Sequence, residues 1–157
     1  VQKADALTLV TLLHLRQISD ANDNPFSIVS EMLDTRNRQL AEAAQADDFI
    51  ISDRLISLML AQVAENKRLT AVFQDLFDPE GSELYLKLAS NYVELGTPVN
   101  FYTVTESARR QGAVAIGYRL DADGHNAAAA YGVKINPNKS ALVTFGPEDR
   151  IVVLAED

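Results

Sequence analysis

The chain has 157 residues, of which 47% are hydrophobic and none is cysteine, and its formal net charge is −8 at pH 7. This length and apolar content suffice for a hydrophobic core in one domain or in two small lobes. The negative charge argues against nucleic acid as a partner, because phosphate binding needs a basic surface. The lack of cysteine excludes disulfides, thiolate nucleophiles and cysteine-ligated zinc.

The first half of the sequence alternates helix-like and strand-like segments. The predicted elements, in chain order, are a helix at 4–18, a strand at 26–33, a helix at 36–45, a strand at 46–52 and helices at 53–65 and 69–77. In the last helix, apolar residues recur at i, i+3, i+4, i+7 and i+8, which is typical of an amphipathic helix. Strands that alternate with helices of this length predict βαβ units and a parallel sheet.

No glycine-rich phosphate loop opens this alternation. Neither G-x-G-x-x-G nor G-x-x-x-x-G-K-[ST] occurs, and the first of the seven glycines is Gly81. A phosphate needs convergent backbone N–H groups at a helix N-terminus, and glycine lets the chain approach closely enough to supply them. We therefore expect a fragment of a larger protein, with the second half of a nucleotide-binding type of lobe at its start.

The pattern changes after Gly81 to that of a compact α+β lobe. The predicted elements are a strand at 83–89, a helix at 101–112 that ends at Gly112, and strands at 113–120, 131–135 and 150–156, with turns at 121–124 and 145–149. The turn at 121–124 opens like a calcium loop, but position twelve counted from Asp121 is Gly132 instead of glutamate. A glycine-containing hairpin turn is the better interpretation.

Several segments resemble known regulatory domains. TVTESARRQG, AVAIGYRL, YGVKINPNKS and FGPEDRIVVLAED resemble the C-terminal lobe of RCK, or TrkA-type, domains. DDFIISDRLISLMLAQVAEN and LFDPEGSELYLK resemble the central region of the CASTOR/POLLUX family of cation channels and their bacterial relatives. The resemblance implies an α/β fold: residues 1–80 form the second half of a Rossmann-like parallel-sheet lobe, and residues 81–157 form a small α+β RCK C-terminal lobe. By this resemblance, we expect the first half of the Rossmann-like lobe to lie outside these residues.

The resemblance also implies a function. It implies a cytosolic regulatory or ligand-sensing module, not an enzyme, that controls a cation channel or a TrkA-like potassium transport system at the cytoplasmic face of the membrane. Related modules assemble into homo-oligomeric dimers or rings and act on a membrane pore domain of the same or a partner chain. The cofactor stays open, with a nucleotide such as NAD, or Ca²⁺, as candidates in the full-length protein. Two alternatives remain: the distal half of the cofactor domain of an NAD-linked oxidoreductase, and a soluble peripheral transport regulator.

One candidate ligand site follows the first predicted strand. In open α/β sheets, ligands bind beyond the carboxyl ends of the strands. Glu31 and Asp34 could hold ribose hydroxyls or a cation there, and Arg36 and Asn37 could reach a phosphate. The alternative is that Asp34 caps the following helix and that the other side chains are solvated.

A second candidate site is acidic. Asp75, Asp78, Glu80 and Glu83 surround the predicted lobe boundary and could hold a divalent cation through oxygen ligands. The alternative is ordinary helix-end and turn chemistry. The apolar helix at 54–63 and the amphipathic helix at 69–77 are the best candidates for contact with another subunit, although burial within the chain would explain them as well.

Overall fold

The computed structural model describes residues 2–21, 26, 28–34, 48–78, 80–124 and 126–156. The chain separates into two compact units, Val1–Thr70 and Ala71–Asp157, and each unit is described by itself. Of the predicted elements, the helix at 36–45 lies outside the described residues.

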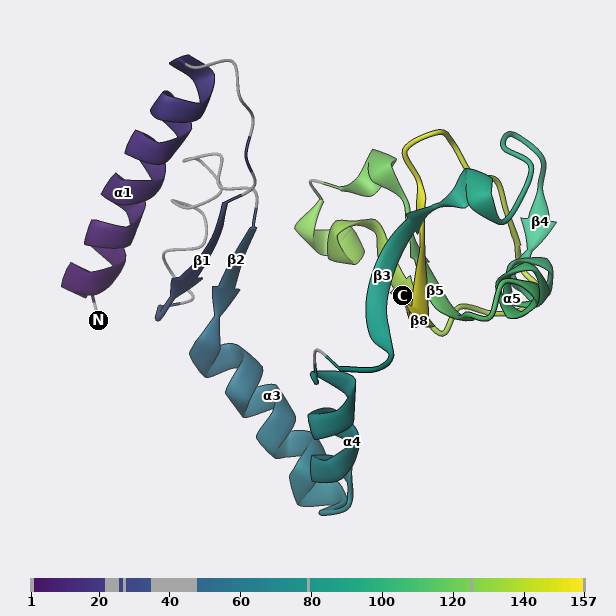
Figure 1. Cartoon of the computed structure of the whole chain (residues 1–157), viewed down its shortest axis with the longest axis horizontal. Helices are drawn as coiled ribbons and strands as arrows, with labels where there is room; N and C mark the ends of the chain where they lie inside the picture. The colour runs from purple at the N-terminus through teal and green to yellow at the C-terminus, as the bar shows by residue number, and fades with distance from the viewer. Residues whose placement is uncertain are drawn as a thin grey trace. The chain divides into compact units, whose positions relative to one another are not determined.

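Unit 1 begins with a long helix followed by two strands. Its elements are α1 (Gln2–Ala21), β1 (Val29–Met32), β2 (Asp48–Ile51) and α3 (Ser52–Glu65), and α4 (Leu69–Leu76) starts at its end (Figure 1). β1 and β2 are parallel, with Val29 opposite Asp48 and Met32 opposite Ile51. The predicted helices at 4–18, 53–65 and 69–77 and both predicted strands are therefore present. The two strands are a parallel pair, which by itself is not a Rossmann-like sheet.

The strand β1 has one buried and one exposed face because strand side chains alternate. Met32 is 0% exposed, whereas Val29 is 66% exposed. α1 packs against β1, and Leu12 of this helix is also buried. Helix α1 thus covers the Met32 side of the strand and leaves the side of Val29 and Glu31 open.

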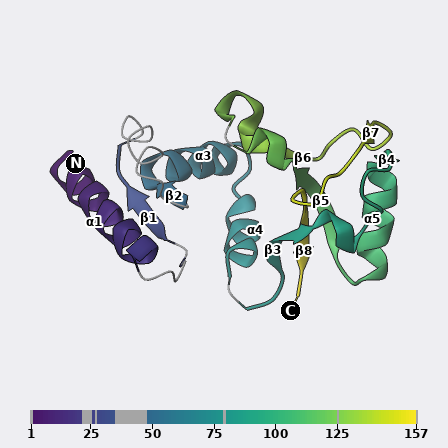
Figure 2. The ribbon, with the colours of Figure 1, turned by 90° about the horizontal axis from the view of Figure 1, so that it is seen from above.

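Unit 2 is built around an antiparallel sheet. Its strands are β3 (Glu83–Leu88), β4 (Val99–Asn100), β5 (Val114–Arg119), β6 (Val133–Ile135), β7 (Leu142–Val143) and β8 (Arg150–Ala155). Four of them form one sheet in the order β3-β8-β5-β6, and β4 pairs with β7. Helix α5 (Phe101–Arg110) lies on one side of the four-stranded sheet in both ribbon views (Figures 1 and 2). The described fold is therefore mixed α and β with an antiparallel sheet.

The core of unit 2 lies between α5 and the inner face of this sheet. Phe101 and Val104 of α5 pack with Ile151 and Val153 of β8, and all four are at most 1% exposed. The ring of Tyr118 meets Phe145 edge-on, with centroids 5.5 Å apart. Such aromatic pairs add to the stabilisation that burial of apolar area provides.

Local sequence signals set both ends of α5. Asn100 caps the helix, and its side-chain oxygen accepts a hydrogen bond from the backbone N–H of Thr103 at 3.1 Å. Gly112 follows the helix with φ of 77°, a conformation that glycine adopts without a steric penalty. The helix ends at Arg110, two residues before the predicted end at Gly112, and Gly112 takes the left-handed conformation just after it.

The connection between β5 and β6 is more structured than a simple turn. It contains a 3₁₀ helix, Asp121–Asp123, and a kinked segment, Ala127–Gly132, whose backbone is not helical from Ala129 to Tyr131. The predicted turn at 121–124 is therefore a short helix, and the predicted strand at 131–135 begins only at Val133. The backbone is left-handed at Ala130, Tyr131 and Gly132, with φ of 51°, 55° and 78°. Despite this long connection, β5 and β6 pair antiparallel as a hairpin does.

Candidate functional site

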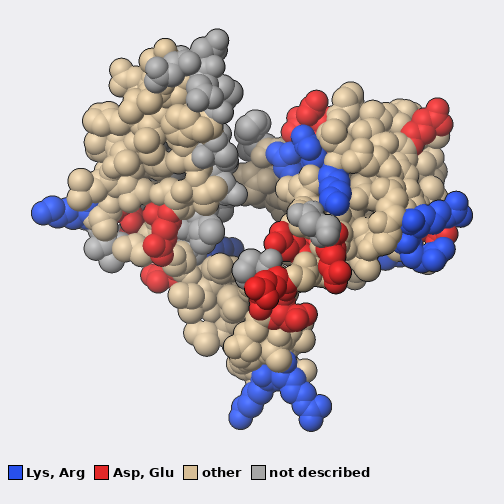
Figure 3. Space-filling view, viewed as in Figure 1, with Lys and Arg blue, Asp and Glu red and all other residues tan. Residues whose placement is uncertain are grey.

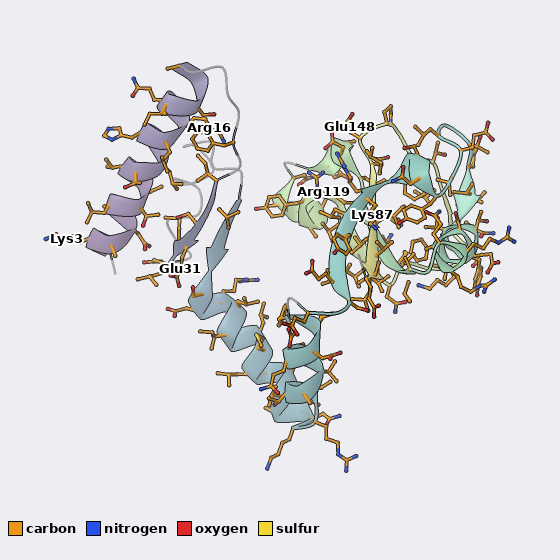
Figure 4. All side chains as sticks on the ribbon, in the orientation of Figure 1. Lys3, Arg16, Glu31, Lys87, Arg119 and Glu148 are labelled. Atoms are coloured by element: carbon orange, nitrogen blue, oxygen red, sulfur yellow. The ribbon has the colours of Figure 1, made fainter. Side chains whose placement is uncertain are left out.

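The carboxyl ends of the parallel strands β1 and β2 meet at one edge, where Met32 lies opposite Ile51. Ser52 starts α3 directly after β2, and its hydroxyl donates a hydrogen bond to the Glu31 carboxylate of β1. Figure 4 shows Glu31 near this end of β1 and the start of α3. A pocket of about 370 Å³ at this place is lined by Val29, Ser30, Glu31 and Ser52.

A buried carboxylate holds the chain just beyond β1. Asp5, in the first turn of α1, is 1% exposed. Its Oδ1 accepts a hydrogen bond from the backbone N–H of Leu33, and its Oδ2 accepts one from that of Asp34, each at 3.0 Å. A negative charge in the first turn of a helix is also favoured by the helix dipole. The two amides that follow β1 therefore bind an internal carboxylate, so a ligand at this edge would use other donors.

The structure places only part of the predicted ligand set. Glu31 is exposed and contacts Ser52, and Asp34 is half-buried two residues beyond the strand. Arg36 and Asn37 lie outside the described residues, so the four-residue site stays a prediction. Sequence reasoning missed the role of Asp5 at this edge. Its only sequence signal is an acidic residue at the start of a helix, which does not indicate a contact 28 residues away.

Removal of the Asp5 carboxylate is expected to destabilise unit 1. Asp5→Ala leaves the amides of Leu33 and Asp34 without their charged acceptor, at an expected cost of about 3 kcal/mol. Amide hydrogen exchange by NMR should show both amides exchanging faster. The matched control is Asp53→Ala, since Asp53 is an exposed acidic residue in the first turn of α3, and we expect it to cost at most about 1 kcal/mol. Equal losses in the two variants would contradict this role of Asp5.

Only two of the four acidic residues near the start of unit 2, Asp78 and Glu80, are joined by a hydrogen bond. Asp78 Oδ1 accepts a hydrogen bond from the backbone N–H of Glu80 at 2.9 Å, while Asp75 lies in α4 and Glu83 starts β3. In the part of the chain that the structure describes, no three histidine, cysteine, aspartate or glutamate side chains are placed to hold a metal ion. The divalent-cation site at these four carboxylates stays a prediction.

A second pocket, of about 510 Å³, lies along the exposed side of α5. It is lined by Asn100, Tyr102, Thr103, Glu106, Ser107 and Arg110. Glu106 accepts hydrogen bonds from Arg109 Nε at 2.8 Å and from Arg110 Nε at 2.9 Å. Both guanidinium groups therefore donate hydrogen bonds to Glu106, the one carboxylate among the residues that line this pocket.

These contacts predict an unusual titration of Glu106. Hydrogen bonds from Arg109, and then from Arg110, lower the pKa of Glu106 from 4.5 to about 2. Since the folded pKa lies below the unfolded one, the stabilisation is complete above pH 4.5 and is lost as the pH falls towards 2. An NMR titration of the Glu106 carboxyl group should show this low midpoint. In Arg109→Gln the midpoint should rise, and an unchanged midpoint would show that Arg109 does not contribute.

Among the helices that the structure describes, none is both long and apolar enough to span a bilayer. No protein-family model matches the sequence. The chain is 34% identical over 142 residues to the probable ion channel POLLUX of Arabidopsis thaliana, and this match covers 90% of the chain. It is 33% identical over 129 residues to the ion channel CASTOR of Lotus japonicus, which covers 82% of the chain. The chain is homologous to one segment of the CASTOR and POLLUX ion channels.

The homology to CASTOR and POLLUX confirms the resemblance predicted from the residues. The chain spans only 16% of the POLLUX relative and 14% of the CASTOR relative. It also aligns with the RCK domain of the GsuK channel over 96% of its own length and 28% of that chain. Sequence identity there is 14% and the TM-score is 0.38, so this structural likeness is too distant to refine the fold.

Proposed function

We infer that this chain is a regulatory module of a cation channel related to CASTOR and POLLUX. The observation that carries this inference is 34% identity to a POLLUX channel over 90% of the chain. Both relatives named above are ion channels by name, which favours a non-enzymatic role over an NAD-linked oxidoreductase. The pore would be formed by other segments of the same protein or by a partner chain, with this module at the cytoplasmic face of the membrane.

The two lobes of an RCK-type module would correspond to the two units, with a proposed boundary at residues 80/81, whereas the compact units divide at Thr70/Ala71. Residues 1–80 would be the second half of a Rossmann-like lobe, and the parallel pairing of β1 with β2 supports this assignment. Residues 81–157 would be the C-terminal lobe, and the antiparallel β3-β8-β5-β6 sheet with α5 on one side supports it.

The ligand site of this module would be the edge beyond β1. Glu31 is held by Ser52 at the mouth of a pocket of about 370 Å³, and Asp34 follows on the same chain segment. Together with Arg36 and Asn37, these residues would bind a nucleotide such as NAD, or Ca²⁺. Such a ligand can shift a channel only through a difference in its affinity for the open and closed states.

Assembly with further copies would use α3 and α4. Within the described part of the chain, neither helix contains a buried residue, and the visible face of α3 carries few charged side chains (Figure 3). Their exposed apolar side chains are Leu55, Ile56, Leu58, Leu60 and Val72. Apolar helix faces of this kind favour contact with another subunit.

The test uses the full-length channel that contains this segment, reconstituted in liposomes. Cation flux is measured with and without NAD or Ca²⁺, for the wild-type channel and for Glu31→Gln. We expect one ligand to change the flux and Glu31→Gln to reduce that response several-fold. Glu65→Gln, at the exposed end of α3, is the matched control and should respond like the wild type. The proposed function would be refuted if neither ligand changed the cation flux and if deletion of this segment also left the flux unchanged.

A further inference from the structure

The four-stranded sheet of unit 2 buries one face and leaves the other open. Ile151 and Val153 of β8 are 0% exposed on the side that packs with α5. Because strand side chains alternate, Val152 between them belongs to the opposite face. The strand pairing gathers further apolar residues there, and we call the set the open sheet face: Leu84, Leu86, Val114, Ile135, Val152 and Leu154.

The open sheet face is a continuous apolar patch. Leu84 and Val114 flank Leu154 from the two neighbouring strands, and Leu86 lies opposite Val152. On the flanking strands, Leu84, Leu86 and Val114 are 46%, 52% and 56% exposed, whereas Val152 of the central strand β8 is 8% exposed and Leu154 is half-buried. Scattered exposed apolar residues are ordinary, whereas adjacent ones on one surface indicate a contact surface.

The charges on this face have opposite signs at its two ends. Along β8 the residues of the open face are Arg150, Val152 and Leu154, and the exposed Glu156 continues the same alternation. Arg119 of β5 lies directly opposite Arg150, so two like charges are neighbours at the basic end. Like charges in directly opposed sheet positions are unfavourable, and a carboxylate from outside the lobe would relieve them.

The carboxylates near the basic end within the lobe give only partial relief. Arg119 Nη1 lies 3.2 Å from Asp121 Oδ1, and Arg150 Nη2 lies 3.7 Å from Glu148 Oε2. Figure 4 labels Arg119 on β5 and Glu148 in the turn before β8. The Glu148 side chain is 70% exposed, and exposed ion pairs contribute little.

We propose that two copies of this chain pack their open sheet faces against each other about a two-fold axis. The axis lies parallel to the sheets, perpendicular to β8 and between Val152 and Leu154. Arg150 of each copy then lies opposite Glu156 of the other. A second copy is the occupant because the order basic, apolar, apolar, acidic is complementary to itself when it is reversed. A two-fold interface requires such self-complementarity, and face-to-face packing of sheets about 10 Å apart is a common arrangement.

This interface deepens the proposed function, because it names a surface through which copies of the module assemble. A closed ring built from symmetric dimers needs two different interfaces. The open sheet face would supply one of them and helices α3 and α4 the other. The two contacts are separable by mutation because they use different residues.

The first test measures the mass of the whole chain by light scattering over a range of concentrations. Arg150→Glu and Glu156→Arg should each weaken association at least ten-fold, and the double variant R150E/E156R should restore it. Leu86→Glu should halve the mass of the largest species. Glu94→Arg, a charge reversal at an exposed site outside the sheet, should change nothing. Circular dichroism confirms that each variant is folded.

A second test does not depend on weakening the interface. The chain has no cysteine, so Leu154→Cys provides one thiol per copy, close to the proposed axis. A short bis-maleimide should link two copies, whereas Tyr102→Cys on the exposed side of α5 should not be linked.

Several results would overturn this interface. They are a monomeric wild type, an undiminished mass for Leu86→Glu, failure of the double variant to restore association, or absence of the Leu154→Cys cross-link. A monomeric chain would mean that another segment or partner covers the open sheet face. A dimer lost in Leu60→Glu of α3 but kept in Leu86→Glu would assign assembly to the helices. Neither result affects the liposome flux test, so failure of this interface is distinguishable from failure of the proposed function.

Discussion

Gly132→Ala is expected to destabilise unit 2 by roughly 4 kcal/mol, because a left-handed backbone penalty and a backbone overlap act together. Gly132 has φ of 78°, and a Cβ placed on it would overlap the carbonyl oxygen of Leu120. The Gly132 carbonyl also accepts a hydrogen bond from the Leu120 N–H at 3.0 Å. This hydrogen bond joins the two ends of the β5–β6 connection. It would be lost if the backbone at Leu120 or at Gly132 moved away to make room for the Cβ.

Gly96→Ala provides a matched control for this prediction. Gly96 has φ of 75°, but a Cβ there has no atom within 4 Å. Gly96→Ala should therefore lower the free energy of unfolding by only about 1 kcal/mol, which is the cost of alanine in the left-handed conformation. Thermal unfolding followed by circular dichroism measures both variants. If the two lose the same stability, the close approach of Gly132 to Leu120 has no energetic importance.

Asp149→Ala is expected to destabilise unit 2 by about 3 kcal/mol. The Asp149 side chain is buried, and its two oxygens accept hydrogen bonds from the backbone N–H groups of Asp121 and Gly146, each at 2.7 Å. Its own carbonyl accepts a bond from the N–H of Ala89 at 2.9 Å. This one residue thus connects the segments that follow β3, β5 and β7.

The neighbouring residue is the control for Asp149. Glu148→Ala removes an exposed carboxylate from the same turn and should change stability by no more than about 0.5 kcal/mol. Urea unfolding monitored by circular dichroism compares the two variants. Hydrogen exchange should also accelerate at the amides of Asp121 and Gly146 in Asp149→Ala. Slow exchange at both amides in that variant would contradict the proposed anchoring.

The helices and strands follow from signals close to them in the sequence. Asn100 and Gly112 determine the ends of α5 through contacts within a few residues. Apolar spacing predicts a helix at 69–77, which the structure shows as α4 (Leu69–Leu76). The β5–β6 connection shows where such signals fail. Nothing in AAAAYG predicts left-handed residues at Ala130 and Tyr131, because that geometry depends on the approach of Gly132 to Leu120.

The candidate site divides in the same way. The sequence alone placed acidic residues at the carboxyl end of the first strand, Glu31 within it and Asp34 just beyond it, and ligands in open α/β sheets bind at such strand ends. It also determined the relation to CASTOR and POLLUX through local sequence segments. Only the tertiary structure decided that the Ser52 hydroxyl donates a hydrogen bond to Glu31. The same holds for the Asp5 carboxylate, which accepts hydrogen bonds from the two backbone amides after β1. The open sheet face likewise emerged only with the strand order β3-β8-β5-β6. The physical reason is that burial and hydrogen bonding between distant residues depend on chain packing, which no local pattern encodes.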